Sequence, residues 1–185
     1  MKIQRKKNNI LYSTNSARVL VCFQIEKIDR EGIDIIINKT CDILNIEDVF
    51  QIDSCGEFED KDVMVQAISS INNDKIDIIS IDNNGINLVI VDSKTQIPKK
   101  KILEQIGINN VLVFKETDGI GNIFDLIDNF SPQYIIPITD NISILEEIYK
   151  KLSVLPEEKV KNFSLTQEEL PSDEEGQPLS LIILE

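Results

Sequence analysis

The segment DSCGEFEDKDVMVQAI occupies residues 53–68 and joins an acidic, polar stretch to an apolar one. The apolar part is a β-branched block that predicts a strand over residues 62–69. Four carboxylates crowd the start of this block, namely Glu57, Glu59, Asp60 and Asp62. Such a cluster could bind a cation, but charged side chains are also typical of an exposed sheet edge. We expect these residues to flank a turn and a strand on a solvated edge.

The rest of the first half has the same β-rich character. Its apolar residues form short blocks of Ile and Val separated by Asn, Asp and Gly, a pattern typical of strands. It predicts further strands over residues 2–5, 10–14, 18–23, 33–37, 49–53, 75–81 and 86–91. Asp82-Asn83-Asn84-Gly85 separates the last two, and Asn and Gly accept the positive φ of a tight hairpin turn. We therefore expect mostly antiparallel pairing, with Gly85 at positive φ.

After Asp92 the pattern changes to an alternation of helices and strands. Helices are predicted over residues 98–106, 121–130 and 142–152, and strands over 111–114 and 134–138. The last helix shows clear helical periodicity, because one face carries Ile144, Leu145, Ile148 and Leu152. Two closing strands are predicted over residues 160–166 and 179–184, on either side of an acidic loop.

This order of elements predicts the fold class. Strands that give way to β-α-β-α units indicate a layered α/β or α+β protein in which helices cover a sheet. We expect the strands between residues 2 and 91 to lie mainly in one antiparallel or mixed sheet, with the later helices packed outside it. The chain has 185 residues, no internal repeat and no long linker, so we predict a single domain spanning residues 1–185.

Charge and cysteine usage restrict the partners and the location. The chain carries 32 acidic and 19 basic side chains, a formal charge of −13, which repels phosphate backbones and predicts no nucleic-acid partner. No apolar run approaches the roughly 20 residues of a membrane span, and no signal-peptide pattern is present, so we expect no membrane association. Three cysteines without a Cys-x-x-Cys pair indicate reduced thiols and a cytoplasmic location.

Histidine is absent from the sequence. The chain therefore has no imidazole base, no Ser-His-Asp or Cys-His nucleophile pair and no His-ligated zinc. The odd cysteine count also argues against a cysteine-built zinc or iron–sulfur site. Carboxylates, hydroxyls, thiols, lysines or backbone groups must carry any chemistry that the protein performs.

The segment quoted first resembles the Gly-Pro-Gly-Glu-Tyr-Glu stretch of small metallo-β-lactamase-fold proteins, the group described as Zn-dependent hydrolases. Gly56-Glu57-Phe58-Glu59 is the most specific part of this match. The likeness continues in order along nearly the whole chain, through residues 10–23, 85–92, 106–114, 134–139 and 161–185. It implies a metallo-β-lactamase-like αβ/βα sandwich.

The resemblance also places the metal ligands of the family on this chain. The His-x-His-x-Asp-His motif falls within residues 38–45. Read without a gap, its four ligand positions are Thr40, Asp42, Leu44 and Asn45; read with a two-residue gap, they are Asn38, Thr40, Asp42 and Ile43. The early Gly-His loop corresponds to residues 6–9, the bridging aspartate to Asp92 and the last metal histidine to Thr139. A hydrolytic zinc site needs about three strong protein ligands, so the resemblance implies the fold but not the activity.

Asp42 and Asp92 remain as weak candidates for holding a hard cation such as Mg²⁺ or Ca²⁺ through oxygen ligands. If they approach each other across a cleft, millimolar Ca²⁺ or Mg²⁺ should stabilise the protein mildly. We favour the alternative in which Asp92 ends a strand and caps a turn. Cys41 and Cys55 fall near the same place by the resemblance, and we expect both to be buried, inert thiols. We assign no catalytic, cofactor-binding or metal-binding residue, and no cofactor.

Three functions remain open at this stage. The leading one is a pseudoenzyme of the metallo-β-lactamase fold, kept for binding a protein or small molecule or for assembly, including assembly into a homo-oligomer. The second is a metal-dependent hydrolase that uses a carboxylate-held Mg²⁺ or Mn²⁺ centre near Asp92. The third is a nucleic-acid-processing relative, against which the negative charge argues.

Overall fold

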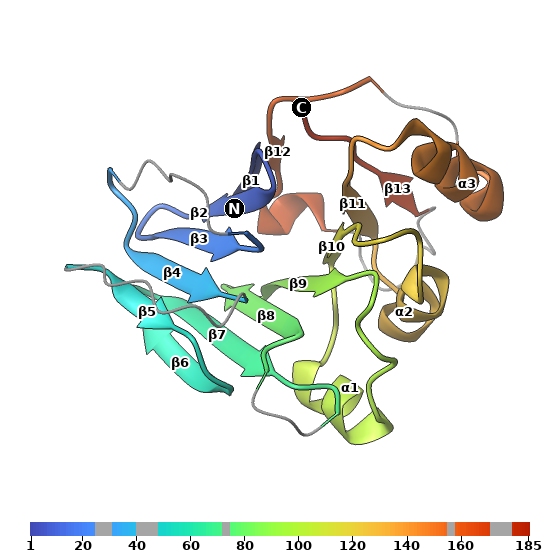
Figure 1. Cartoon of the computed structure of the whole chain (residues 1–185). Coiled ribbons are helices and arrows are strands. Elements are labelled where there is room, and N and C mark those ends of the chain that lie inside the picture. Colours follow the sequence, from blue (N-terminus) through green and yellow to red (C-terminus); the bar gives the residue numbers. More distant parts are fainter. Residues whose placement is uncertain (25–30, 40–47, 72–74, 155–157, 171–178) are drawn as a thin grey trace.

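The computed structural model describes residues 1–24, 31–39, 48–71, 75–154, 158–170 and 179–185. Their strands form two sheets that pack face to face (Figure 1). Across the first sheet the strands are β12 (Phe163–Ser164), β1 (Lys2–Lys6), β2 (Asn9–Ser13), β3 (Arg18–Cys22), β4 (Ile35–Asn38) and β5 (Phe50–Ile52). Across the second sheet they are β13 (Ser180–Leu181), β11 (Tyr134–Ile138), β10 (Val111–Lys115), β9 (Ile86–Asp92), β8 (Ile78–Asn83), β7 (Val63–Ile68) and β6 (Gly56–Asp60).

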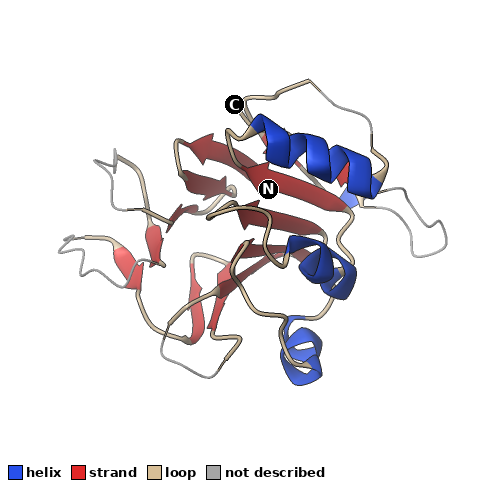
Figure 2. Cartoon of the chain, turned by 45° about the vertical axis from the view of Figure 1, so that its right-hand side comes forward, coloured by secondary structure: helices blue, strands red, loops and turns tan. Residues whose placement is uncertain are grey.

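Three α-helices lie on the outer face of the second sheet (Figures 1 and 2). They are α1 (Lys100–Ile106), α2 (Ile123–Phe130) and α3 (Ile142–Leu152), and a 3₁₀ turn, η1 (Gln167–Glu169), follows β12. None of the helices in the described part of the chain is long and apolar enough to cross a membrane. A layered α/β sandwich with external helices confirms the predicted fold class.

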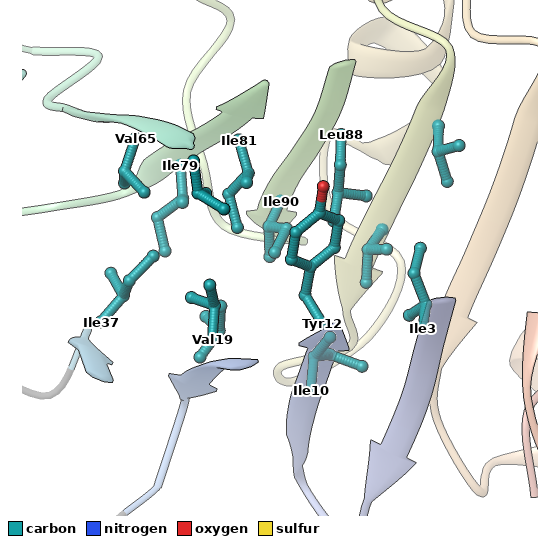
Figure 3. Close-up of a cluster of buried hydrophobic side chains, with 14 of the residues drawn as sticks. Ile3, Ile10, Tyr12, Val19, Ile37, Val65, Ile79, Ile81, Leu88 and Ile90 are labelled. Carbon is teal, nitrogen blue, oxygen red and sulfur yellow. The ribbon is translucent and has the colours of Figure 1, made fainter. Parts of the chain in front are cut away.

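The central strands β9, β10 and β11 of the second sheet are apolar on both faces because each face is covered. In β9, Leu88 and Ile90 point into the space between the sheets, whereas Val89 and Val91 point toward the helices. The period-two alternation of strand side chains produces this division. Figure 3 shows the inner layer, in which Ile10 and Tyr12 of the first sheet point toward side chains of the second.

The expectation that the strands between residues 2 and 91 share one sheet is wrong. The chain leaves the first sheet after β5 and enters the second at β6, so that β1–β5 and β6–β9 face each other. A single sheet would leave one of its two apolar faces in water, whereas two sheets bury both inner faces against each other. The acidic segment forms the edge strand β6, with Glu57 and Glu59 exposed.

Individual elements agree closely with the sequence predictions in the middle of the chain and less at its end. The bounds predicted for α3 and β11 match those of the structure, and α1 and α2 each begin two residues later than predicted. The closing strands are shorter than predicted, since β12 and β13 have two residues each. These strands lie at sheet edges, where each pairs with one neighbour only.

The hairpin between β8 and β9 yields a first prediction. Asn84 and Gly85 have φ values of 52° and 77°, which confirms the positive φ expected at Gly85. A Cβ at Gly85 would meet only the Gln167 side chain, at 3.5 Å, so a substitution is costly through the backbone and not through a lack of space. We expect Gly85→Val to lower the free energy of unfolding by more than about 1 kcal/mol, measured by urea denaturation. The control is Asn84→Gly, which removes a side chain at the other positive φ of the turn and should not destabilise the protein. An unchanged denaturation midpoint in Gly85→Val would contradict the predicted backbone strain at Gly85.

The hydroxyl of Tyr12 yields a second prediction. The residue is fully buried between the sheets, and its oxygen has no hydrogen-bond partner among the described residues (Figure 3). Burial, assisted by the charge of Asp82, raises the pKa of the phenol well above its usual range. An unpaired buried hydroxyl is unfavourable, so Tyr12→Phe should stabilise the protein by about 1 kcal/mol. Tyr134→Phe, at a half-buried ring, is the control with little expected change, and a loss of stability in Tyr12→Phe would show that the hydroxyl is bonded in solution.

Candidate functional site

A cleft of about 530 Å³ opens where the ends of strands from both sheets come together. β9 and β10 run parallel in one sheet, and β3 and β4 run parallel in the other, so each pair ends at a common edge. The residues that line the cleft end or follow these four strands or precede β8: Phe23, Gln24, Lys39, Lys75, Asp92, Lys115, Glu116, Thr117 and Asp118. The cleft is therefore built from strand ends that are far apart in the sequence.

Asp92 ends β9 and closes a turn. Its Oδ1 accepts a hydrogen bond from the backbone N–H of Lys94 at 2.9 Å, and its own N–H donates to Oγ1 of Thr95 at 3.1 Å. The Thr95 N–H donates a hydrogen bond to the Asp92 carbonyl at 3.0 Å. These bonds are those of an aspartate that caps a turn, which is the role that we favoured from the sequence.

The second carboxylate oxygen of Asp92 faces a lysine. Lys39 directly follows β4, its side chain is 5 % exposed, and its Nζ lies 3.5 Å from Asp92 Oδ2. The same Nζ donates to the carbonyl oxygen of Asp77 at 2.9 Å and lies 5.4 Å from the centre of the Phe23 ring. Burial lowers the pKa of Lys39, and the charges of Asp92 and Asp77 oppose this shift. The site thus pairs a buried ammonium with Asp92, the residue that the resemblance places at the bridging-aspartate position.

Thr139, the position of the last metal histidine by resemblance, follows β11. Its hydroxyl accepts the N–H of Asn141 at 3.0 Å and lies 3.4 Å from Oε2 of Glu116. Glu116 also accepts the N–H of Gly119 at 2.9 Å through its other oxygen. Thr139 therefore supports the loops beside the cleft, and its oxygen is engaged within the chain.

Basic side chains approach the same edge from two further directions. Lys115, at the end of β10, is partly buried, and this burial lowers the pKa of its ammonium. Arg5 forms a bidentate pair with Asp140, with N–O distances of 2.9 and 2.7 Å, and this pair joins β1 to the loop after β11. The contact with Arg5 holds the pKa of the Asp140 carboxyl below its usual value.

Several residues considered from the sequence do not meet at the cleft. Asp42, Cys41 and the rest of the 40–45 stretch lie outside the described residues, so the register of the lost histidine motif and an approach of Asp42 to Asp92 stay predictions. The expectation that Cys55 is buried is wrong, because this residue is exposed directly before β6, whereas Cys22 is buried at the end of β3. Lys39 and Asp77 were missed, although a lysine two residues after the apolar run Ile35–Ile37 is a signal that a sequence can give.

The residues present do not fit the family's zinc centre. Among the described residues, no group of three or more His, Cys, Asp or Glu side chains is placed to share a metal ion. Around Asp92 the nearest charged group is the Lys39 ammonium, which is a cation and cannot be a ligand while protonated. A metal ion beside Asp92 would have to displace this ammonium.

Comparison with solved structures defines the class of fold. A metallo-β-lactamase superfamily protein of Thermotoga maritima, for which a Zn-dependent hydrolase function has been proposed, has a TM-score of 0.71 at 14% identity, over 100% of this chain and 99% of that one. The metallo-β-lactamase fold protein YhfI of Bacillus subtilis has a TM-score of 0.57 at 8% identity, over 98% and 95% of the two chains. A variant of the β-hydroxylase CmlA has a TM-score of 0.54 at 10% identity, over 74% of this chain and 45% of that one.

The chain has the metallo-β-lactamase fold, as the resemblance predicted. No family model and no curated protein matches its sequence. At these identities the structural matches establish the fold, and the function has to be argued from the cleft.

A glycine beside the cleft yields a third prediction. Gly121 has a φ of 52°, and a Cβ at this position would lie 1.9 Å from the carbonyl oxygen of Ser93. The same carbonyl accepts the N–H of Asn122 at 3.0 Å, which fixes the start of α2 against the loop after β9. Gly121→Ala should therefore lower the free energy of unfolding by more than about 2 kcal/mol, measured by urea denaturation.

The control for this prediction is Gly107→Ala. Gly107 also has a positive φ, of 74°, but a Cβ there meets nothing within 4 Å. It reports backbone strain without a clash, at φ 74° and ψ −148°, a conformation that essentially only glycine adopts. A larger loss in Gly121→Ala therefore reports the contact with Ser93. Equal losses of stability would contradict the steric argument.

Proposed function

We propose that this chain is a non-catalytic protein of the metallo-β-lactamase fold, a pseudoenzyme that acts by binding or assembly. The observation that carries the proposal is the buried ammonium of Lys39 beside Asp92. A metal-dependent hydrolase needs a divalent cation with an open coordination position for water, held by several protein ligands. Here Asp92 faces the Lys39 ammonium, which is positively charged and has no lone pair with which to bind a metal ion.

A hydrolase with a carboxylate-held Mg²⁺ or Mn²⁺ centre at Asp92 is the competing function. Mg²⁺ is commonly held by one or two carboxylates together with water, so the chemistry of Asp92 alone permits it. The ammonium, however, repels a divalent cation at the same oxygen, and the like charges would share a partly buried space. The Lys39 position therefore favours the non-catalytic proposal.

The partner that we propose is a protein or a small molecule, and the location is the cytoplasm. The net charge of −13 opposes a nucleic-acid partner and the nucleic-acid-processing alternative. The cleft of about 530 Å³ has the size of an ordinary small-molecule pocket and carries side chains of both charges. A polar small molecule is thus the simplest occupant.

The test is to measure metal content and hydrolysis in the same preparation. Protein purified without chelator or metal-affinity tag should contain far less than one equivalent of metal by mass spectrometry. With added Zn²⁺, Mn²⁺ or Mg²⁺ it should hydrolyse phosphodiester, lactam and thioester substrates no faster than Asp92→Ala does, because the cleft offers no open metal position.

Two results would contradict the proposal. One is stoichiometric, tightly bound metal in the wild-type protein. The other is turnover that Asp92→Ala abolishes and that Asp118→Ala retains, since Asp118 is an exposed carboxylate of the same cleft. Either result would replace the non-catalytic proposal with the carboxylate-metal hydrolase.

A further inference from the structure

The Lys39 ammonium is part of a cycle of hydrogen bonds and one ion pair among the described residues. The Asp92 N–H donates to Oγ1 of Thr95 at 3.1 Å, and this hydroxyl donates to the Asp77 carbonyl at 3.2 Å. The same carbonyl accepts a hydrogen bond from the Lys39 ammonium at 2.9 Å, and the ammonium forms an ion pair with the Asp92 carboxylate at 3.5 Å. The four residues come from both sheets, so the cycle ties the end of β4 to the cleft edges of β8 and β9.

The oxygen atoms in this cycle are fixed independently of the lysine. The Asp77 carboxylate accepts the N–H of Ser70 at 2.7 Å and also bonds the Ser70 hydroxyl, which anchors the segment before β8. The bond from the Lys94 N–H orients the Asp92 side chain, and the bond from the Asp92 N–H to Thr95 fixes its backbone. A carboxylate oxygen and a backbone carbonyl oxygen therefore both lie within 3.5 Å of one position, which Lys39 Nζ occupies.

Such a pair of oxygens is a partial ligand set for a hard cation. Ca²⁺ is bound by carboxylates, backbone carbonyls and water, and Mg²⁺ by one or two carboxylates and several waters. A cation of either kind at this position would neutralise Asp92 in the way that the ammonium does. The lysine carries this charge on a covalently attached side chain, so the cation is supplied by the chain itself and not by a dissolved ion.

We propose that the Lys39 ammonium is the built-in cation of the cleft, placed where Asp92 and the Asp77 carbonyl would otherwise hold a divalent metal ion. The inference rests on the proposed non-catalytic function, because it assigns the same cleft a charge of its own in place of a metal. It differs from the expectation that millimolar Ca²⁺ or Mg²⁺ stabilises the protein if Asp42 and Asp92 approach each other across the cleft. The wild-type protein should not respond to divalent cations, and removal of the ammonium should create a response.

The experiment compares thermal unfolding of the wild type, Lys39→Met, Asp92→Asn and the double variant, each with millimolar CaCl₂ or MgCl₂ and with NaCl of equal ionic strength. Methionine keeps much of the length and apolar stem of lysine but removes the charge. We expect Lys39→Met to lower the Tm by several degrees and Ca²⁺ to raise it again, by mass action on the folded state. The double variant should lose the response to Ca²⁺, and the wild type should show none beyond that to NaCl.

Lys94→Met is the matched control. Lys94 pairs with Asp118 at the same side of the cleft, but its side chain is 58 % exposed and its partner 80 % exposed. Loss of an exposed pair should change the Tm little and should create no response to Ca²⁺. A response in Lys94→Met equal to that in Lys39→Met would show general charge screening and would overturn the proposal.

The remaining outcomes also decide the matter. A folded Lys39→Met variant without a response to Ca²⁺ and Mg²⁺ would overturn the proposal, and metal-free, inactive wild-type protein would then leave the non-catalytic function standing. Stoichiometric metal in the wild type, lost in Asp92→Ala, would overturn both. If Lys39→Met does not fold, Asp92→Asn decides: it should lower the Tm more than Lys94→Met does, because it leaves the buried ammonium without its counter-charge. If the Tm of Asp92→Asn falls no further than that of Lys94→Met, the ion pair with Asp92 does not stabilise the buried ammonium, and the proposal is overturned.

Discussion

The apolar layer between the two sheets positions everything that the cleft contains. Ile and Val side chains from both inner faces meet there, and those at the centre have no exposed surface. Each such side chain contributes about 1.5–3 kcal/mol when it is fully removed from water. Because this layer sets how the sheets face each other, it also brings the end of β4 close to the cleft edges of β8 and β9. The Lys39–Asp92 pair exists only because the sheets are held in this way.

Local sequence patterns predicted the individual elements well but not their division between two sheets. The Asn84-Gly85 turn and the apolar face of α3 are local signals, and both correspond to the structure. The transfer of the chain from β5 to β6 has no such signal, since β6 is the acidic segment, over which the sequence predicted no strand of its own. It follows from the need to cover two apolar faces, which is a property of the whole chain.

The candidate site shows the same division. Asp92 could be found from its place at the end of an apolar strand and from the resemblance. Lys39 could not be found by looking for the lost metal ligands, because a lysine is not a substitute for histidine as a ligand. It substitutes instead for the charge of the ion, and this relation appears only when the distance from Nζ to Asp92 is known. The 40–45 stretch, which the resemblance emphasised, lies outside the described residues.

The burial of Lys39 is tolerated because two polar groups, the Asp77 carbonyl and the Asp92 carboxylate, contact its ammonium. An isolated ammonium loses several kcal/mol of hydration on burial, and its pKa falls for that reason. The Asp77 carbonyl and the Asp92 carboxylate return part of this energy. Removal of either charged partner would therefore cost more than the pair contributes, because the other charge would stay buried without compensation. The loss of one partner therefore lowers the free energy of unfolding more than the intact pair raises it.

A position that the resemblance assigns to a metal ligand can be stable without a metal ion in two ways, and this protein shows both. At Thr139 the side chain is neutral, and its hydroxyl accepts the N–H of Asn141 and lies beside Glu116. At Asp92 the carboxylate is kept, and a cation from the opposite sheet faces it. The polar groups of the cleft are then satisfied by the chain itself. A ligand that enters gains little from any single one of them unless it offers an equivalent partner to the group that it displaces, which favours recognition by shape and by several weak polar contacts together.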